Sequence, residues 1–169
     1  ASDRALDRGD HPLFVDMRGA RWTSETTYQV ADSARRYEDW EFPYALVLGQ
    51  GAAARYALDV GVDVAQGRAW TLAAALRDAL GTLPGVRALD RGATQCAIVT
   101  IEVAGHHANA IVNALAERRI NVVASLREFG IYDFTAKGVQ TAVRLSPHYY
   151  NTEAEIAEAV EAVLEILNA

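Results

Sequence analysis

The sequence predicts an α+β domain in which helices cover one face of a mainly antiparallel sheet. Three observations lead to this fold class. Two segments with apolar residues every three or four positions come first, and short β-branched segments begin at residue 86. A final helix with one apolar stripe then follows the last predicted strand. The predicted order of elements is α-α-β-β-α-β-β-α.

The composition is that of a folded domain in a reducing compartment. The chain has 169 residues, of which 51% are hydrophobic and 22% charged, enough for one domain or slightly more. No apolar run reaches the roughly 18 residues that span a bilayer, and the first ten residues are too charged for a secretory signal. A single cysteine fits the cytoplasm. The net charge of −6 argues against nucleic-acid or anionic-membrane partners.

The first 40 residues read as an irregular segment, distinct from a regular domain over residues 41–169. Turn-forming and charged residues dominate this stretch, yet seven aromatic residues lie between Phe14 and Tyr44. A structureless stretch of this length is uncommon inside a compact domain. Its aromatic side chains therefore need a ligand, a partner or another part of the protein to pack against.

Two helices are expected next. Apolar spacing from Ala45 to Val60 predicts a helix that ends at Gly61, and Asp63 with Gln66 forms a plausible capping box for a second helix to Leu80. The run from Gly49 to Ala54 also fits the dinucleotide pattern G-x-G-x-x-A. The unbroken helical spacing and the lack of an acid-ended second strand favour a helix instead.

The remaining elements alternate between strand and helix. We expect strands at Val86–Leu89, Cys96–Val103, Asn121–Leu126 and Thr141–Ser146. A helix with Ala108, Ile111, Val112 and Leu115 on one face separates the second strand from the third. The last helix begins with a capping box of Thr152 and Glu155, and its stripe is Ile156, Ala159, Val160, Val163, Leu164 and Leu167.

Several chemical signals favour ordinary structural roles. Adjacent His106 and His107 point in different directions on a helix and are expected to be surface or capping residues, so no metal site is predicted. Ser146-Pro147-His148 lacks the glycine-flanked turn of a hydrolase nucleophile. Cys96 is expected to be a buried thiol within its strand. Lys137, the only lysine among 16 basic residues, is expected on a surface turn.

Arg144 is the strongest candidate for a binding residue. Strand alternation places Val143 and Leu145 on one face and Arg144 on the other, beside Ala142 and Ser146. If the first face covers the core, the arginine projects with small neighbours and leaves room for a planar carboxylate on its two-pronged guanidinium. A structural or solvated arginine is the alternative.

The segment Val143–Ile156, VRLSPHYYNTEAEI, resembles the closing signature of class V aminotransferases, the fold-type I pyridoxal-phosphate family that includes cysteine desulfurases. That signature is an R-x-S strand, a loop with an aromatic and N/T-T, and a T-x-x-E-I helix start. Other matching segments are Arg35-Arg36-Tyr37-Glu38, the helix pair, Leu83-Pro84-Gly85-Val86 and Ile120-Asn121-Val122. The resemblance covers essentially the whole chain.

The resemblance implies a role for this chain within a larger enzyme. It would be the small C-terminal domain of a homodimeric, pyridoxal 5'-phosphate-dependent enzyme, with residues 1–40 ending the large cofactor domain and forming an interface loop. Arg144 would bind the α-carboxylate of an amino-acid substrate, and the domain would close over it. The Schiff-base lysine and most cofactor contacts would come from the preceding part of the enzyme, so the segment alone would be inactive and holds no catalytic residue.

Two departures from the family pattern refine this implication. The family's G-T-P-N after R-F-E reads Asp39-Trp40-Glu41-Phe42-Pro43 here, which suggests that Trp40 contacts the cofactor across the dimer interface. The desulfurase nucleophile follows the strand equivalent to residues 121–125, where this chain has no cysteine. An aminotransferase, an epimerase or a C–S lyase remains open. The alternatives are a non-catalytic amino-acid-binding and dimerisation module and a fragment of a nucleotide-dependent oxidoreductase.

Overall fold

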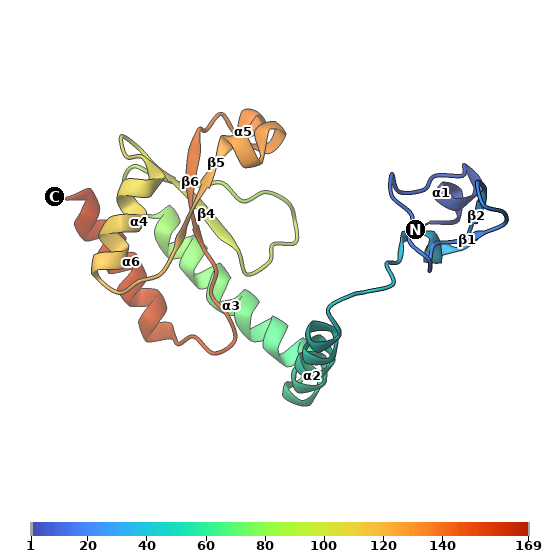
Figure 1. The fold of residues 1–169 in the computed structure, drawn as a ribbon. Helices are drawn as coiled ribbons and strands as arrows, with labels where there is room; N and C mark the ends of the chain where they lie inside the picture. The colour runs from blue at the N-terminus through green and yellow to red at the C-terminus, as the bar shows by residue number, and fades with distance from the viewer. Residues whose placement is uncertain (1, 169) are drawn as a thin grey trace. The chain divides into compact units, whose positions relative to one another are not determined.

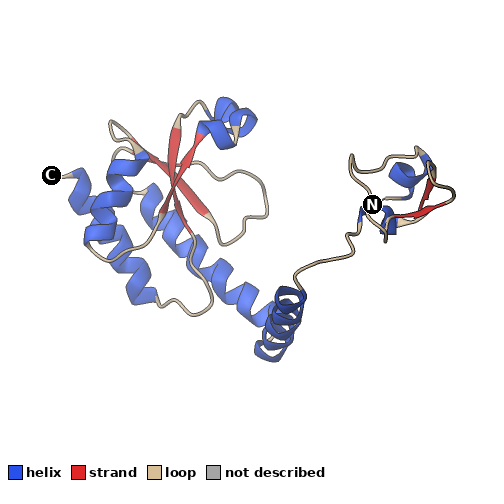
Figure 2. Ribbon diagram, in the orientation of Figure 1, coloured by secondary structure: helices blue, strands red, loops and turns tan. Residues whose placement is uncertain are grey.

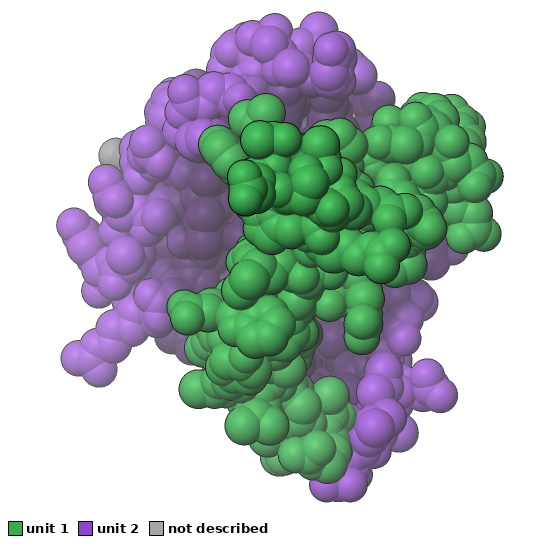
Figure 3. Space-filling model, turned by 45° about the vertical axis from the view of Figure 1, so that its right-hand side comes forward, with its two compact units in different colours: residues 1–56 green, residues 57–169 purple. Residues whose placement is uncertain are grey.

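The computed structural model describes residues 2–168, which divide into two compact units (Figures 1 and 3). Unit 1 is Ala1–Tyr56 and unit 2 is Ala57–Ala169. Each unit has its own sheet, of two strands in the first and four in the second. The division falls within a helix, 16 residues after the boundary at residue 40 expected from composition, and that boundary stays a prediction.

Unit 1 consists of short elements. They are α1 (Asp3–Asp7), β1 (Ala20–Trp22), β2 (Tyr28–Val30), the 3-10 helix η1 (Ala34–Tyr37) and most of α2 (Tyr44–Val60). The two strands form an antiparallel hairpin in which Trp22 pairs with Tyr28. Because each strand has three residues, neither repeats long enough to produce a period in the sequence. The expectation of an irregular segment therefore missed these elements.

Buried Arg36 connects separate segments of unit 1 by hydrogen bonds to their backbone carbonyls. Its Nε donates to the Ala31 carbonyl at 2.9 Å and its Nη1 donates to the Asp10 carbonyl at 3.0 Å. The Tyr37 hydroxyl donates to the same Asp10 carbonyl at 2.7 Å. The guanidinium thus offsets the cost of its burial through backbone carbonyls rather than through a carboxylate.

Two consecutive helices follow, α2 and α3 (Val62–Gly81), separated at Gly61. Gly61 has a φ of 90°, a conformation that favours glycine, which explains why the helical period breaks there. The expected capping box was wrong, because α3 begins at Val62 and Gly61 caps it without a side-chain hydrogen bond. Gly49 and Gly51 lie inside α2, which confirms a helix rather than a dinucleotide loop.

The sheet of unit 2 has the strand order β3-β4-β6-β5, with every neighbouring pair antiparallel. Its strands are β3 (Val86–Ala88), β4 (Val99–Val103), β5 (Val123–Leu126) and β6 (Thr141–Leu145), drawn in red in Figure 2. The helices of unit 2 that follow α3 are α4 (Ala108–Glu117), the 3-10 helix η2 (Arg127–Phe129), α5 (Ile131–Lys137) and α6 (Glu153–Leu167). The predicted α+β class is confirmed.

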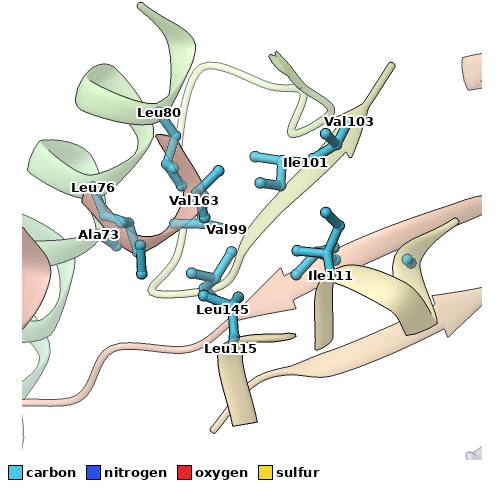
Figure 4. Close-up of a cluster of buried hydrophobic side chains, with 13 residues drawn as sticks. Ala73, Leu76, Leu80, Val99, Ile101, Val103, Ile111, Leu115, Leu145 and Val163 are labelled. Atoms are coloured by element: carbon cyan, nitrogen blue, oxygen red, sulfur yellow. The ribbon is translucent and has the colours of Figure 1, made fainter. Parts of the chain in front are cut away.

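The main core lies between the sheet and helices α3, α4 and α6 (Figure 4). We call this side of the sheet the closed face. The buried core between this face and the helices consists entirely of apolar side chains: Ala73, Leu76, Leu80, Val99, Ile101, Val103, Ala108, Ile111, Leu115, Val143, Leu145, Ala162 and Val163. Alternate residues of β4 and β6 point into it, as the strand period requires.

Helix α5 was missed by sequence analysis. It has seven residues and none of them is buried, so it carries no apolar stripe. Its half-buried Phe134 packs against a small second cluster of Leu89, Val139 and Ala142. This cluster covers part of the sheet and explains why Ala142 is buried although it shares a face with Arg144.

The expected capping box of α6 is confirmed. The Thr152 hydroxyl accepts from the Glu155 N–H at 3.2 Å, and a Glu155 carboxylate oxygen accepts from the Thr152 N–H at 2.8 Å. These contacts hold the pKa of the Glu155 carboxyl below its usual value, the Thr152 N–H having the largest effect.

Among residues 2–168, no helix is both long and apolar enough to span a membrane.

Candidate functional site

Arg144 lies on an interior strand of the sheet, pointing away from the main core. β6 pairs with β4 on one side and β5 on the other, so Arg144 is opposite Thr100 and Val123. Its strand neighbours Val143 and Leu145 are buried while Arg144 is exposed. The predicted alternation is therefore confirmed. We call the side carrying Thr100, Glu102, Val123 and Arg144 the open face.

The carboxylate of Glu102 lies on the open face but is bonded to another arginine. Arg87, opposite Glu102 in the register of β3 and β4, donates to its Oε2 from Nε at 2.9 Å and from Nη2 at 2.7 Å. The third Arg87 contact is from Nη1 to the Lys137 carbonyl at the end of α5, at 3.2 Å. Arg87 thus connects β3, β4 and α5.

A second carboxylate, Asp90, is bonded to Thr100, the residue opposite Arg144 on β4. Arg77 Nε donates to Asp90 Oδ2 at 2.8 Å, and the two side chains are only 11% and 13% exposed. The Thr100 N–H donates to Asp90 Oδ1 at 3.1 Å, and the Thr100 hydroxyl also donates to this oxygen. Arg77 further donates to the carbonyls of Cys96 and Ile98 and so fixes the loop that precedes β4.

Arg144 itself has no such partner. Within residues 2–168, the guanidinium makes no hydrogen bond, ion pair or ring contact. Arg77 and Arg87 each bind a carboxylate, whereas Arg144, on interior strand β6, binds none in the described chain. A guanidinium without an internal carboxylate partner can form charge-assisted hydrogen bonds with an external one.

The loop after Arg144 is an ordered aromatic turn. The His148 N–H donates to Asn151 Oδ1 at 2.8 Å, and the His148 ring lies 4.8 Å from the ring of Tyr149 and 4.8 Å from that of Tyr150. In the described chain no hydrogen bond joins exposed Ser146 to His148.

Arg68 of α3 anchors the end of this turn. Its Nη2 donates to the Asn151 carbonyl at 3.1 Å and to Glu153 Oε2 at 2.9 Å, and its Nη1 forms an ion pair with Glu153. The hydrogen bond from Arg68 is the largest cause that lowers the pKa of Glu153 to about 2. The turn that follows Arg144 is therefore pinned to the helical layer.

Trp40, the expected cofactor contact, lies in unit 1 with its ring half exposed. Its N–H donates to Asp16 Oδ2 at 3.0 Å, and this bond is the main reason that the pKa of Asp16 lies below its usual value. The Arg18 guanidinium lies 5.7 Å from the Trp40 ring and 5.3 Å from the Phe42 ring. Trp40 is thus held through its backbone while its ring stays half exposed.

The other residues singled out from sequence have structural roles or differ from expectation. His107 caps α4 by accepting from the Asn109 N–H at 3.2 Å, as expected. Cys96 was expected to be buried but is exposed, because β4 begins at Val99 and leaves it in the preceding loop. Lys137 was expected on a surface turn but ends α5, with its side chain only 14% exposed and its Nζ 2.8 Å from Asp133. No cluster of three metal-ligating side chains occurs in the described part of the chain.

Sequence analysis missed the two arginine–carboxylate pairs beside Arg144. Arg87 and Glu102 are 15 positions apart, and Arg77 and Asp90 come from a helix and a loop. Only the strand register and the packing of α3 bring them together. Alternating charge on β3 and β4 was the one available signal, but it required the register to be known.

The fold is thus an α+β domain whose antiparallel sheet packs helices α3, α4 and α6 on its closed face and carries exposed Arg144 on its open face. The sequence matches the family model described as aminotransferase class-V over residues 16–158. The chain therefore belongs to the class V aminotransferase family.

Solved structures share this fold at low sequence identity. The cysteine desulfurase CsdA from Escherichia coli superposes with a TM-score of 0.83 at 23% identity, over 99% of this chain and 41% of that protein. A cysteine desulfurase from Thermococcus onnurineus gives 0.81 at 19% identity, over 93% and 39%. The cystine C-S lyase C-DES, solved with its product cysteine persulfide, gives 0.68 at 22% identity, over 91% and 38%.

The extent of these matches limits what they say about activity. The chain spans about two fifths of the length of the desulfurase from Escherichia coli. A search of curated protein sequences found no match. The matches thus establish the fold and the family, and the activity of the whole enzyme is a separate question.

Proposed function

We propose that this chain is the C-terminal part of a pyridoxal-phosphate-dependent enzyme that acts on an amino acid, and that Arg144 binds the substrate α-carboxylate. The observation that carries the proposal is the unpaired Arg144 guanidinium on the open face of the sheet, in a chain of the class V family. Both neighbouring carboxylates are bonded to other arginines, so the charge of Arg144 is available to a ligand.

The chemistry of the guanidinium suits this role. Its planar fork offers two parallel N–H donors to the two oxygens of a carboxylate, and such charge-assisted bonds are stronger than neutral ones. β6 is hydrogen-bonded on both sides, so the backbone that carries Arg144 is held on an interior strand. A fixed carboxylate contact would orient the α-carbon of the substrate toward the cofactor.

The cofactor itself would be bound mainly by another part of the enzyme. Pyridoxal phosphate withdraws electrons from the bonds at the α-carbon of a bound amino acid. C-DES has been solved with glycine covalently linked to this cofactor. Lys137, the only lysine here, has its Nζ bonded to Asp133 and does not fit a covalent attachment role. We therefore assign the Schiff-base lysine to the remainder of the protein and expect this segment alone to be inactive.

Trp40 would complete the cofactor site across a homodimer interface. Its ring is half exposed, and its backbone is fixed by Asp16. A fixed, exposed aromatic ring can pack against a planar cofactor or line its pocket. Unit 2 would in turn close over the bound substrate.

The reaction class is an aminotransferase, an epimerase or a C–S lyase. A nucleophilic cysteine would distinguish a desulfurase, but β5 and the segment between β5 and α5 contain none. The exposed thiol of Cys96 is in the loop before β4 instead. Sulfur transfer through a cysteine of this chain is therefore not part of the proposal.

The test is substitution of Arg144 in the full-length enzyme. Arg144→Ala should raise the KM for the amino acid by about 10- to 100-fold, because it removes charge-assisted hydrogen bonds of about 1.5–3 kcal/mol. The melting temperature should change little, since the side chain is exposed and makes no hydrogen bond or ion pair in the described chain. Arg144→Lys, the matched control, should recover part of the binding without the bidentate geometry.

A visible absorption spectrum of the same samples completes the experiment. Wild-type and variant enzymes should both carry a yellow chromophore, because the cofactor is bound elsewhere. Unchanged KM values in Arg144→Ala would overturn the assignment of Arg144. A colourless protein that binds amino acids but ignores added cofactor would instead identify a non-catalytic binding and dimerisation module.

A further inference from the structure

We propose that Arg87 is a positioning residue that keeps the Glu102 carboxylate away from Arg144 and so preserves the substrate-binding charge. The inference rests on the proposed role of Arg144 in carboxylate binding. It concerns a different residue on a different strand, and it addresses why an arginine surrounded by potential partners stays unpaired.

The sheet register places Glu102 within reach of Arg144. Thr100 is directly opposite Arg144, and Glu102 is two residues further along the same strand, on the same face. Diagonal neighbours of this kind in an antiparallel sheet are about 7–8 Å apart, a distance that two long side chains can bridge. Ala142, next to Arg144's strand neighbour Val143 on β6, is buried in a cluster with Leu89 and Val139 that Phe134 covers, so the two long side chains would have to meet over this cluster.

Arg87 holds the Glu102 carboxylate at the far side of β4. Two of its nitrogens bond to one carboxylate oxygen at 2.7 and 2.9 Å, and a third contacts the Lys137 carbonyl at 3.2 Å. This last bond fixes the guanidinium at the C-terminus of α5, where a positive charge is favourable. Glu102 is therefore drawn toward β3, in the direction opposite to Arg144 on β6.

Removal of Arg87 would change the balance on the open face. Glu102 would be left as a carboxylate without its partner and only 35% exposed, with Arg144 as the unpaired cation on the same face. An ion pair between them would occupy the guanidinium that the substrate must bind. The substrate carboxylate would then have to displace an internal one, which weakens binding without removing any substrate contact.

The Asp90 pair follows the same logic but serves as a poorer test. Asp90 contacts Thr100, the residue directly opposite Arg144, and Arg77 neutralises it. However, Arg77 also bonds the carbonyls of Cys96 and Ile98, so its loss would disturb the loop before β4. Arg87 pairs with Glu102 in a more exposed place, so its effect on binding can be separated from its effect on folding.

The experiment compares three variants of the full-length enzyme: Arg87→Ala, Glu102→Gln and the double variant. Two quantities are measured for each, the KM for the amino-acid substrate and the Kd for lactate, a carboxylate without an amino group, by isothermal titration calorimetry. Arg87→Ala should raise both by about fivefold, the effect of one partly exposed ion pair. Glu102→Gln should leave both unchanged, and the double variant should return both to wild-type values.

The outcomes separate this inference from a structural effect and from the proposed function. If Arg87 only supports the fold, Glu102→Gln will not rescue Arg87→Ala, and the inference is overturned. Unchanged constants in Arg87→Ala would also overturn it. An Arg144→Ala variant measured alongside tests the underlying assignment: if it binds lactate and substrate as the wild type does, the proposed function fails, whatever Arg87 does.

Discussion

The two faces of the sheet in unit 2 differ in composition and packing. The closed face packs apolar side chains from β4 and β6 against three helices, with Val99, Ile101 and Val143 almost completely buried. The open face carries Thr100, Glu102 and Arg144 from the same strands; Glu102 is paired with Arg87, whereas Arg144 has no charged partner in the described chain. The same backbone therefore supplies stability on one side and selective charge on the other. Substitutions on the two sides should have effects of different kinds.

Truncation on the closed face gives the largest expected effect on stability. Ile111→Ala removes a side chain of α4 that is completely buried against the sheet. The loss of transfer free energy and the resulting cavity should lower the free energy of unfolding by about 2–5 kcal/mol. Urea unfolding at pH 7 measures the change.

The matched control for Ile111→Ala is Val123→Ala, on the open face, where the side chain is 49% exposed. Its effect should be below about 1 kcal/mol, since it leaves no closed cavity. Equal losses from the two substitutions would mean that the open face is covered in the working protein and would remove the distinction between the faces.

The next effect concerns charge at different depths. Arg77→Met should lower the free energy of unfolding by about 2–3 kcal/mol, because it leaves nearly buried Asp90 without its cation. Arg87→Met breaks a pair whose side chains are 50% and 35% exposed and should cost less than about 1 kcal/mol. Thermal unfolding of both variants by circular dichroism would rank them. The reverse order would show that burial does not determine the strength of these pairs.

The smallest effect lies outside both faces, at the Arg68–Glu153 pair. The pKa of Glu153 falls from 4.5 to about 2 on folding, mainly through its hydrogen bond with Arg68. A lowered carboxyl pKa adds stability that is fully present above pH 4.5 and is lost as the pH falls toward 2. The difference in unfolding free energy between wild type and Glu153→Gln should therefore shrink over this range. A difference that stays constant with pH would show that Glu153 does not titrate in this way.

The sequence predicted the elements whose periods are long enough to read. The helices around Leu72 and Ile156 and the strands around Ile101 and Val143 have repeating apolar positions, and their burial follows those positions. The exposure of Arg144 followed from the same alternation. The unpaired state of Arg144 could not be read in this way.

The elements and contacts that were missed depend on tertiary structure. Helix α5 has seven residues and no buried side chain, and the hairpin strands of unit 1 have three residues each, too few to repeat a pattern. Cys96 was placed in a strand because its neighbours are β-branched, whereas Arg77 binds its carbonyl and holds it in a loop. Side chains distant in sequence determine these features, so local patterns do not contain them.

The position of β6 within the sheet has a mechanical consequence. Because β6 is bonded to β4 and β5 along both edges, its backbone cannot shift alone without breaking two ladders of hydrogen bonds. Arg144 can reorient its side chain, but the point from which it extends moves only with the whole four-stranded sheet and the helices packed on it. The Arg144 guanidinium can therefore move by no more than the length of its side chain unless the sheet and its helices move with it.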